Sequence, residues 1–226
     1  MNLETLEYPP LTEDIEEAKN HLDKYGMALI ANVLSFDEID EMDKRLNEQF
    51  LGEEKYKVGS KIRGDEGLGV ESSDEEKVSR LVWNLINKGD CFLKLIDHPK
   101  ILPLIQHIIG EKVCLCSMGA HMNGSGNERM ALHQDQWPLV PHPMDFPFMA
   151  NVMYLISDNS PENGGTRLIP GSHKWPLIDY RTANGEEIQK MANSLTAPKG
   201  TAIVWEGRLW HGNGFCLLYT SPSPRD

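Results

Sequence analysis

Two residues in the stretch Met130–Trp137 have the types and the spacing of metal ligands. His133 supplies an imidazole and Asp135 a carboxylate. In an extended strand, side chains alternate between two faces, so these two would point the same way. With a second imidazole from a later strand they would form the 2-His-1-carboxylate arrangement, which holds non-heme iron(II) and leaves coordination positions open. The spacing therefore predicts a redox-active metal centre.

A His-x-Asp pair is weak support by itself, because the chain contains a second one, His21-Leu22-Asp23. That pair lies in a helical pattern, where residues two apart do not face each other and could not chelate one ion. Local structure therefore favours His133 and Asp135.

The second imidazole should follow a strand that enters the same pocket. The predicted strand Thr201–Glu206 leads to the segment Leu209-Trp210-His211-Gly212-Asn213-Gly214. His211 is therefore the candidate third ligand. The alternative is a buried or turn histidine beside Trp210.

Helical periodicity and capping residues dominate the first half of the chain. A short buried strand, Met27–Val33, interrupts it, and a charged, glycine-rich loop over Glu53–Glu76 could act as a lid. The predicted helices are one capped by Thr12 and ended by Gly26, one from the Ser35/Glu38 capping box to Gly52, one over Val78–Ile86, and one over Ile101–Ile109.

After Gly110 the pattern changes to short apolar runs separated by turn residues, which indicates strands. They are Val113–Met118, Met130–Gln136, Ala150–Ile156, Thr166–Ile169, Ser194–Ala197 and Thr201–Glu206. This order predicts an α+β fold, a double-stranded β-helix (jelly roll) with the N-terminal helices packed on one sheet. We expect one domain over residues 1–226, helix-rich over 1–110 and strand-rich over 111–215.

Composition excludes several partners. The formal charge of −12 would repel nucleic acids and anionic membranes. Neither a long apolar run nor a signal peptide is visible, so we expect a cytoplasmic protein. The four cysteines contain no Cys-x-x-Cys pair and are expected to be reduced thiols. A small-molecule substrate is the expected partner, and the oligomeric state stays open.

Three motifs follow one another in order: His133-Gln134-Asp135, then Asn163-Gly164-Gly165-Thr166-Arg167-Leu168-Ile169-Pro170-Gly171-Ser172-His173, then Trp210-His211-Gly212-Asn213-Gly214. Together they resemble the phytanoyl-CoA dioxygenase family of iron(II)- and 2-oxoglutarate-dependent oxygenases. The resemblance extends from near His21 to Gly214 and includes Arg80-Leu81-Val82-Trp83-Asn84-Leu85.

The resemblance implies that His133, Asp135 and His211 bind Fe(II), that 2-oxoglutarate takes two further positions and that O2 takes the last. In related halogenases a small residue replaces the carboxylate so that a halide can bind, so Asp135 favours hydroxylation or a related oxidation. Thr166 and Arg80 are predicted to contact the co-substrate carboxylate, although packing and a solvated charge are their alternatives. His173 is predicted to order a turn.

The C-terminal end departs from the family pattern. The family continues with an Asn-Arg segment and, about one strand later, an arginine that holds the far carboxylate of 2-oxoglutarate by a two-pronged ion pair. Here Arg225 lies beyond Pro222 and Pro224, which are unsuited to a central strand. We expect residues 216–226 to be a non-native tail that leaves a sheet edge open and weakens co-substrate binding.

The predicted function is oxidation of a small organic substrate by an iron(II)- and 2-oxoglutarate-dependent dioxygenase. One alternative is a non-catalytic jelly-roll binding protein or a truncated, inactive fragment of such an enzyme. Another is a zinc hydrolase, because the same ligand types accept zinc, although no His-Glu-x-x-His helix is present. Substrate choice is assigned to the loop Gly52–Glu76 and to Trp137, Pro138, Pro141, His142 and Phe146.

Overall fold

A computed structural model of the chain describes residues 3, 5–58, 60–63, 78–123, 130–136 and 145–216. Its helices are α1 (Ile15–Tyr25), α2 (Phe36–Tyr56), α3 (Asp90–Leu93), α4 (Leu102–Ile109), α5 (Tyr180–Ala183) and α6 (Glu186–Met191), with 3-10 helices η2 (Leu85–Asn87) and η3 (Ser172–Lys174). Its strands are β1 (Leu11–Thr12), β2 (Met27–Ile30), β3 (Ser60–Arg63), β4 (Val78–Trp83), β5 (Gly119–Met122), β6 (Ala150–Tyr154), β7 (Thr166–Leu168), β8 (Asn193–Ser194), β9 (Ala202–Glu206) and β10 (His211–Asn213).

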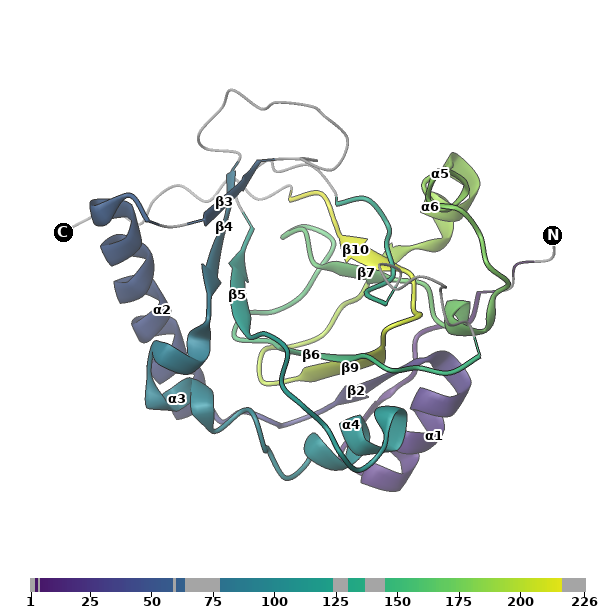
Figure 1. Cartoon of the computed structure of the whole chain (residues 1–226), viewed down its shortest axis with the longest axis horizontal. Helices are drawn as coiled ribbons and strands as arrows, with labels where there is room; N and C mark the ends of the chain where they lie inside the picture. The colour runs from purple at the N-terminus through teal and green to yellow at the C-terminus, as the bar shows by residue number, and fades with distance from the viewer. Residues whose placement is uncertain are drawn as a thin grey trace.

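The strands form three sheets, seen around the centre of Figure 1. One has the order β1-β2-β9-β6, the second β10-β7-β8 and the third β3-β4-β5, and every pairing except β1 with β2 is antiparallel. The mixed α and β composition agrees with the prediction. A complete double-stranded β-helix stays a prediction, because the described strands form three separate sheets.

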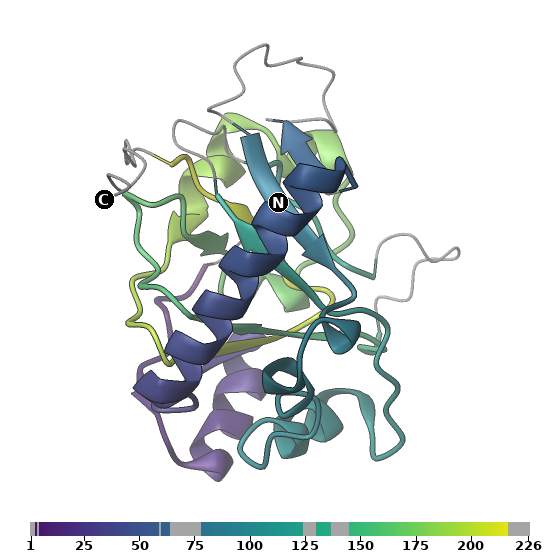
Figure 2. The same ribbon diagram turned by 90° about the vertical axis from the view of Figure 1, so that its left-hand side faces the viewer.

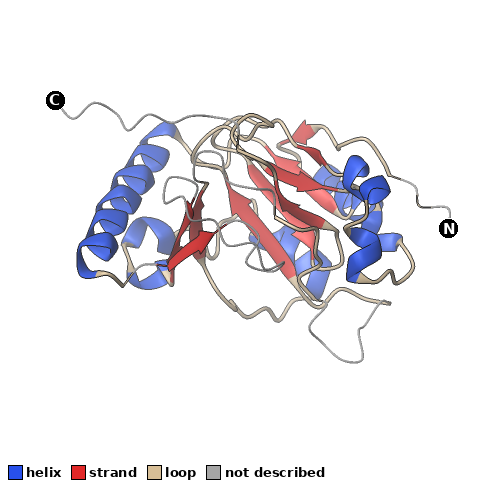
Figure 3. Cartoon of the chain, turned by 90° about the horizontal axis from the view of Figure 1, so that it is seen from above, coloured by secondary structure: helices blue, strands red, loops and turns tan. Residues whose placement is uncertain are grey.

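Apolar side chains divide the molecule into layers. Alternate residues of β9 face opposite ways: Val204 packs with Ala18 and Leu22 of α1, whereas Ile203 packs with Leu168 of β7. Helices α1 and α4 therefore cover the outer face of the four-stranded sheet, and its inner face meets the β10-β7-β8 sheet (Figures 1 and 3). Helix α2 lies along the β3-β4-β5 sheet, as Figure 2 shows. The interior between the first two sheets is where a site can be enclosed.

The first two helices begin at side chains that bind free backbone N–H groups. Asp14 accepts from the N–H groups of Glu16 and Glu17 at 2.8 and 3.0 Å, so the N-cap of α1 is Asp14, not Thr12 as predicted. The predicted capping box of Ser35 and Glu38 is present at α2. Helix α2 continues past Gly52 to Tyr56, because a glycine inside a helix costs only about 1 kcal/mol.

The predicted helix over Val78–Ile86 is wrong. Residues Val78–Trp83 form β4, which pairs with β3 on one side and β5 on the other, and Asn84 ends it with a φ of 55°. The apolar positions have helical spacing, but β-branched and aromatic residues suit a strand equally well when two neighbours are available. Pairing between distant segments therefore decided the structure here.

Three other predictions about elements need correction. Val113–Met118 is not a strand, and pairing begins only at Gly119. Met130–Gln136 forms a single bridge instead of a continuous strand. Helices α5 and α6 were not predicted. The predicted loop contains the end of α2 and β3, while its residues 64–76 lie outside the described ranges, as does the tail 217–226.

Two further predictions concern thiols and membranes. The cysteines are free: Cys91 and Cys216 are buried, whereas Cys114 and Cys116 are exposed. No described helix is both long enough and apolar enough to cross a membrane.

The turn after β7 packs against the end of α1. His173 is buried there, and a Cβ atom added to Gly26 would lie 2.5 Å from its Nδ1 atom. Gly26 also has a φ of 74°, and its N–H donates to Leu22, which ends the helix. His173 therefore has a packing role in this turn, and the turn requires glycine at position 26.

Replacing Gly26 with alanine should lower the free energy of unfolding by about 2 kcal/mol or more, because the new methyl group combines left-handed strain with a clash. Gly52→Ala is the matched control. It lies inside α2 with no atom within 4 Å of its added Cβ, so it should raise stability by about 0.5–1 kcal/mol. Urea unfolding of both variants measures the difference, and equal effects would contradict the packing described.

Burial lowers the pKa of His173 to about 4, and the positive charges of Lys174 and Arg208 act in the same direction. An unfolded histidine titrates near 6.5. Between these values the unfolded chain binds a proton that native His173 does not, so stability should fall as pH falls, by up to about 3 kcal/mol at pH 4. Urea unfolding at several pH values should show a shallower pH dependence for His173→Gln. Identical slopes would contradict this assignment.

Candidate metal centre

The segment Met130–Gln136 runs beside β10, and His133 and His211 face each other across an antiparallel bridge. The N–H of His133 donates to the carbonyl of His211 at 2.9 Å, and the reverse bond is 3.0 Å. Residues paired in this way direct their side chains to the same face. Their ring centroids are 4.4 Å apart. One backbone bridge therefore brings together two imidazoles from distant parts of the chain.

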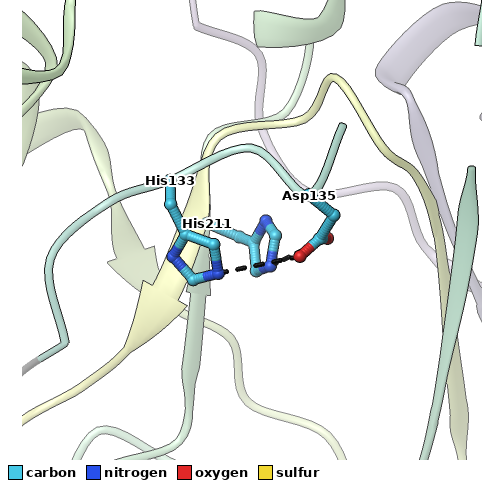
Figure 4. A group of neighbouring side chains, drawn as sticks. All are labelled: His133, Asp135 and His211. Atoms are coloured by element: carbon cyan, nitrogen blue, oxygen red, sulfur yellow. Dashed lines mark ion pairs between the residues drawn. The ribbon is translucent and has the colours of Figure 1, made fainter. Parts of the chain in front are cut away.

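Asp135 completes the group, as Figure 4 shows. Its Oδ1 lies 3.7 Å from Nε2 of His133, and its Oδ2 lies 3.2 Å from Nε2 of His211. One ligand atom from each of the three residues lies within 4.8 Å of the other two. Two ligands bonded to one ion at about 2.1 Å would be about 3 Å apart at a right angle. The three side chains are close enough to hold one metal ion.

The hydrogen bonds of the two imidazoles determine which nitrogen faces this centre. Nδ1 of His133 lies 3.1 Å from the carbonyl of Ala131, and Nδ1 of His211 lies 2.9 Å from the carbonyl of Leu209. A carbonyl can only accept, so each Nδ1 carries a proton, and Nε2 is the ring nitrogen available to a metal. This use of the second ring nitrogen is typical of metal-binding histidines.

Burial also favours a neutral His211. It lowers the pKa of His211 to about 4, although the charge of Asp135 opposes the shift. The two Nε2 atoms and the carboxylate of Asp135 converge at this centre. The donor set therefore fits a divalent metal, and iron(II) among others accepts two imidazoles with one carboxylate.

Two residues that sequence analysis did not identify hold the carboxylate. The side chains of Asn151 on β6 and Trp205 on β9 both donate to Oδ2 of Asp135. No local sequence signal marks either residue, because their position depends on how β6 pairs with β9.

Thr166 lies on β7, whose register pairs Leu168 with His211 and Thr166 with Asn213. Paired residues and residues two apart share a face of a sheet. Thr166 is therefore on the same inner face as His211. Its hydroxyl contacts Sδ of Met153 at 3.3 Å.

Arg80 was predicted on a helix and lies on β4. It shares a face with Val82, which packs against α2, and its Nη2 lies 3.5 Å from Oε1 of Glu54 on that helix. The structure therefore directs Arg80 to α2 and does not bring it to the three converging side chains.

The second His-x-Asp pair is separated as helical geometry requires. His21 is buried on α1. Asp23 instead faces α4, where its Oδ1 lies 2.8 Å from Nε2 of His107. Of the residues assigned to substrate choice, Phe146 is exposed, and Trp137, Pro138, Pro141 and His142 lie outside the described ranges.

Two relatives are similar to this chain over most of its length. Dioxygenase af480 of Aspergillus fumigatus is 29% identical over 208 residues, which are 90% of this chain and 62% of the relative. A probable alpha-ketoglutarate-dependent hypophosphite dioxygenase of Stutzerimonas stutzeri is 26% identical, over 88% of this chain and 72% of the relative. The chain thus spans less than two thirds of the Aspergillus protein.

Solved structures show a similar fold. HygX from Streptomyces hygroscopicus, with nickel and 2-oxoglutarate bound, superposes with a TM-score of 0.65 at 16% identity, covering 89% of this chain and 81% of HygX. The alpha-ketoglutarate-dependent epimerase SnoN of nogalamycin biosynthesis gives 0.63 at 18% identity, covering 89% and 74%. The family model described as phytanoyl-CoA dioxygenase (PhyH) matches residues 22–214. Since this match covers most of the sequence, the chain belongs to the phytanoyl-CoA dioxygenase family.

Proposed function

We propose that the chain is a non-heme iron(II)- and 2-oxoglutarate-dependent dioxygenase that oxidises a small organic substrate, with His133, Asp135 and His211 as the metal ligands. The observation that carries the proposal is the convergence of two Nε2 atoms and one carboxylate within 4.8 Å of one another, while each Nδ1 is bound to a backbone carbonyl. Family membership gives this metal site its reaction class.

The three side chains would supply three ligand atoms to the ion and would leave coordination positions open for a chelating co-substrate and O2. When bound, the metal would activate O2, which is the oxidant, while 2-oxoglutarate would supply two of the four electrons that O2 accepts and would be converted to succinate and CO2. The chain itself fixes the geometry, because the Nδ1 atoms of both histidines are bound to backbone carbonyls.

Surrounding residues would exclude water and orient the co-substrate. The inner face beside His211 is apolar, with Leu168, Leu209 and Trp205 buried. Thr166 is proposed to donate its hydroxyl to a co-substrate carboxylate, which its shared face with His211 supports. The contact between Arg80 and Glu54 gives no support to the same role for Arg80.

Hydroxylation, or a related oxidation, is the outcome we favour, because Asp135 occupies the position that a halide would need. Solved proteins of similar fold include an epimerase and a carbocyclase, so the fold itself accommodates several outcomes. The proposed substrate is a small molecule that reaches the interior between the two facing sheets.

A binding protein without turnover is the alternative that one observation favours. Three buried or half-buried arginines have other partners: Arg80 contacts Glu54, Arg167 contacts Gln189, and Arg208 contacts Glu206. The far carboxylate of 2-oxoglutarate would then need a cation from outside this set. Weak co-substrate binding in a protein that still binds metal would support this alternative.

Anaerobic addition of iron(II) and 2-oxoglutarate should produce a weak visible charge-transfer band that neither component produces alone. The reason is that the band requires the co-substrate to chelate an iron held at the site. Titration of its amplitude gives the dissociation constant. No band, together with tight zinc binding and ester hydrolysis, would contradict the proposal and favour a hydrolase.

Asp135→Ala should weaken iron(II) binding at least a hundredfold, because it removes the only anionic ligand of the three. His21→Ala should leave iron binding unchanged, because His21 is on α1, away from the other side chains. Metal analysis of the purified variants after equilibrium dialysis measures both. Equal iron loss in the two variants would show that the ligands were wrongly assigned.

A further inference from the structure

The carboxylate of Asp135 is held by side chains of another sheet, not by its own segment. Residues Asp135 and Gln136 form a turn after the bridge at His133, so their side chains are not directed by a strand ladder, although the N–H of Gln136 donates to the carbonyl of Gly207 at 3.2 Å. Oδ2 of Asp135 instead accepts from Nδ2 of Asn151 at 2.7 Å and from Nε1 of Trp205 at 3.3 Å. An amide can approach a carboxylate oxygen only with its NH2 end, which assigns the orientation of Asn151.

These two donors form one rung of the four-stranded sheet. Asn151 of β6 is the register partner of Trp205 of β9, so their side chains lie next to each other on one face. Trp205 is also restrained, because it is buried among apolar side chains and its ring centroid lies 5.1 Å from that of His211. This pair of residues, Asn151 and Trp205, therefore contacts both Asp135 and His211, and it does so from two paired strands of the sheet.

The chemistry of the donors distinguishes the two carboxylate oxygens. Each oxygen of an ionised carboxylate has about two acceptor positions. Asn151 and Trp205 occupy the two acceptor positions of Oδ2. Neither residue could bind a metal ion through the N–H group that it directs at Oδ2. Each oxygen lies near one imidazole: Oδ1 is 3.7 Å from Nε2 of His133, and Oδ2 is 3.2 Å from Nε2 of His211. Of the two oxygens, Oδ1 is the one whose acceptor positions Asn151 and Trp205 do not use. Oδ1 is thus the oxygen left for a metal.

We infer that Asn151 and Trp205 are positioning residues that fix Asp135 as a ligand through Oδ1 alone. This inference rests on the proposed metal site. Binding through one oxygen would leave the ion one more open position than binding through both, and a chelating co-substrate together with O2 would need that position. The rung thus keeps the site open for its co-substrate.

The test uses Asn151→Leu, which removes one donor at similar volume, and Trp205→Phe, which removes the N–H and keeps an aromatic ring. Trp175→Phe is the matched control, because Trp175 packs in a different apolar cluster on the other side of β7. For each purified full-length variant, cobalt(II) affinity, the cobalt(II) visible spectrum, 2-oxoglutarate affinity of the cobalt(II) form by calorimetry, and metal-free thermal stability are measured.

We expect Asn151→Leu to weaken cobalt(II) binding about 10–100-fold, as loss of a hydrogen bond to a ligand generally does. Trp205→Phe, which loses the longer bond, should weaken it about tenfold. Both variants should alter the cobalt(II) spectrum and should also weaken 2-oxoglutarate binding. The reason is that Oδ2 of Asp135, once it has lost a donor, could bind the metal together with Oδ1. Trp175→Phe should change only stability.

Two outcomes would overturn the inference. If wild-type protein binds cobalt(II) and both variants bind it with unchanged affinity and spectrum while losing stability, the rung has a structural role and the proposed function survives. If wild-type protein binds neither cobalt(II) nor iron(II), the proposed function fails and the inference fails with it.

Discussion

The backbone bridge between His133 and His211 is the contact on which the rest of the site depends. Two hydrogen bonds, each about 3 Å long, set the separation and the common direction of both imidazoles. The bridge itself requires β10 to be held in place, which its pairing with β7 achieves. Packing of β7 against the inner face of the four-stranded sheet then brings Asp135 within reach of Asn151 and Trp205. Each layer of the fold thus adds one restraint to the same small group of atoms.

The turn between β9 and β10 adds two more restraints through its backbone. The carbonyl of Leu209 accepts from Nδ1 of His211, and that of Arg208 accepts from the buried side chain of Gln134. Arg208 is itself held by two hydrogen bonds to Glu206, at 2.6 and 2.9 Å. Gln134 lies between the two residues of the His-x-Asp pair and faces away from them. The hydrogen bond of Gln134 thus attaches the segment that carries His133 and Asp135 to this turn.

Local signals in the sequence were sufficient for the elements that depend on neighbouring residues. The capping box at Ser35, the helix end at Gly26 and the short runs that became β6, β7 and β9 are of this kind. His133, Asp135 and His211 could also be predicted as one site, because their residue types suit a metal and a single backbone bridge brings the two histidines together.

Features that depend on pairing between distant segments could not be predicted in this way. Val78–Trp83 has the apolar spacing of a helix, and only β3 and β5 on either side make it a strand. The same holds for Asn151 and Trp205, whose shared contact with Asp135 depends on the register of β6 against β9. An asparagine and a tryptophan inside strands carry no sign of the carboxylate that they will meet.

The separation of the ligands along the chain has a consequence for folding. His133 and Asp135 precede β6, and His211 follows β9, so the loop that joins them contains most of the strands of both facing sheets. In an unfolded chain, closing so long a loop costs conformational entropy before any ligand pair can form. A metal ion should therefore bind the native state almost exclusively and act as a removable cross-link. At a free metal concentration one hundred times the dissociation constant, such binding would add about 2.7 kcal/mol to stability. Metal supply would then influence how long the folded protein survives, as well as whether it is active.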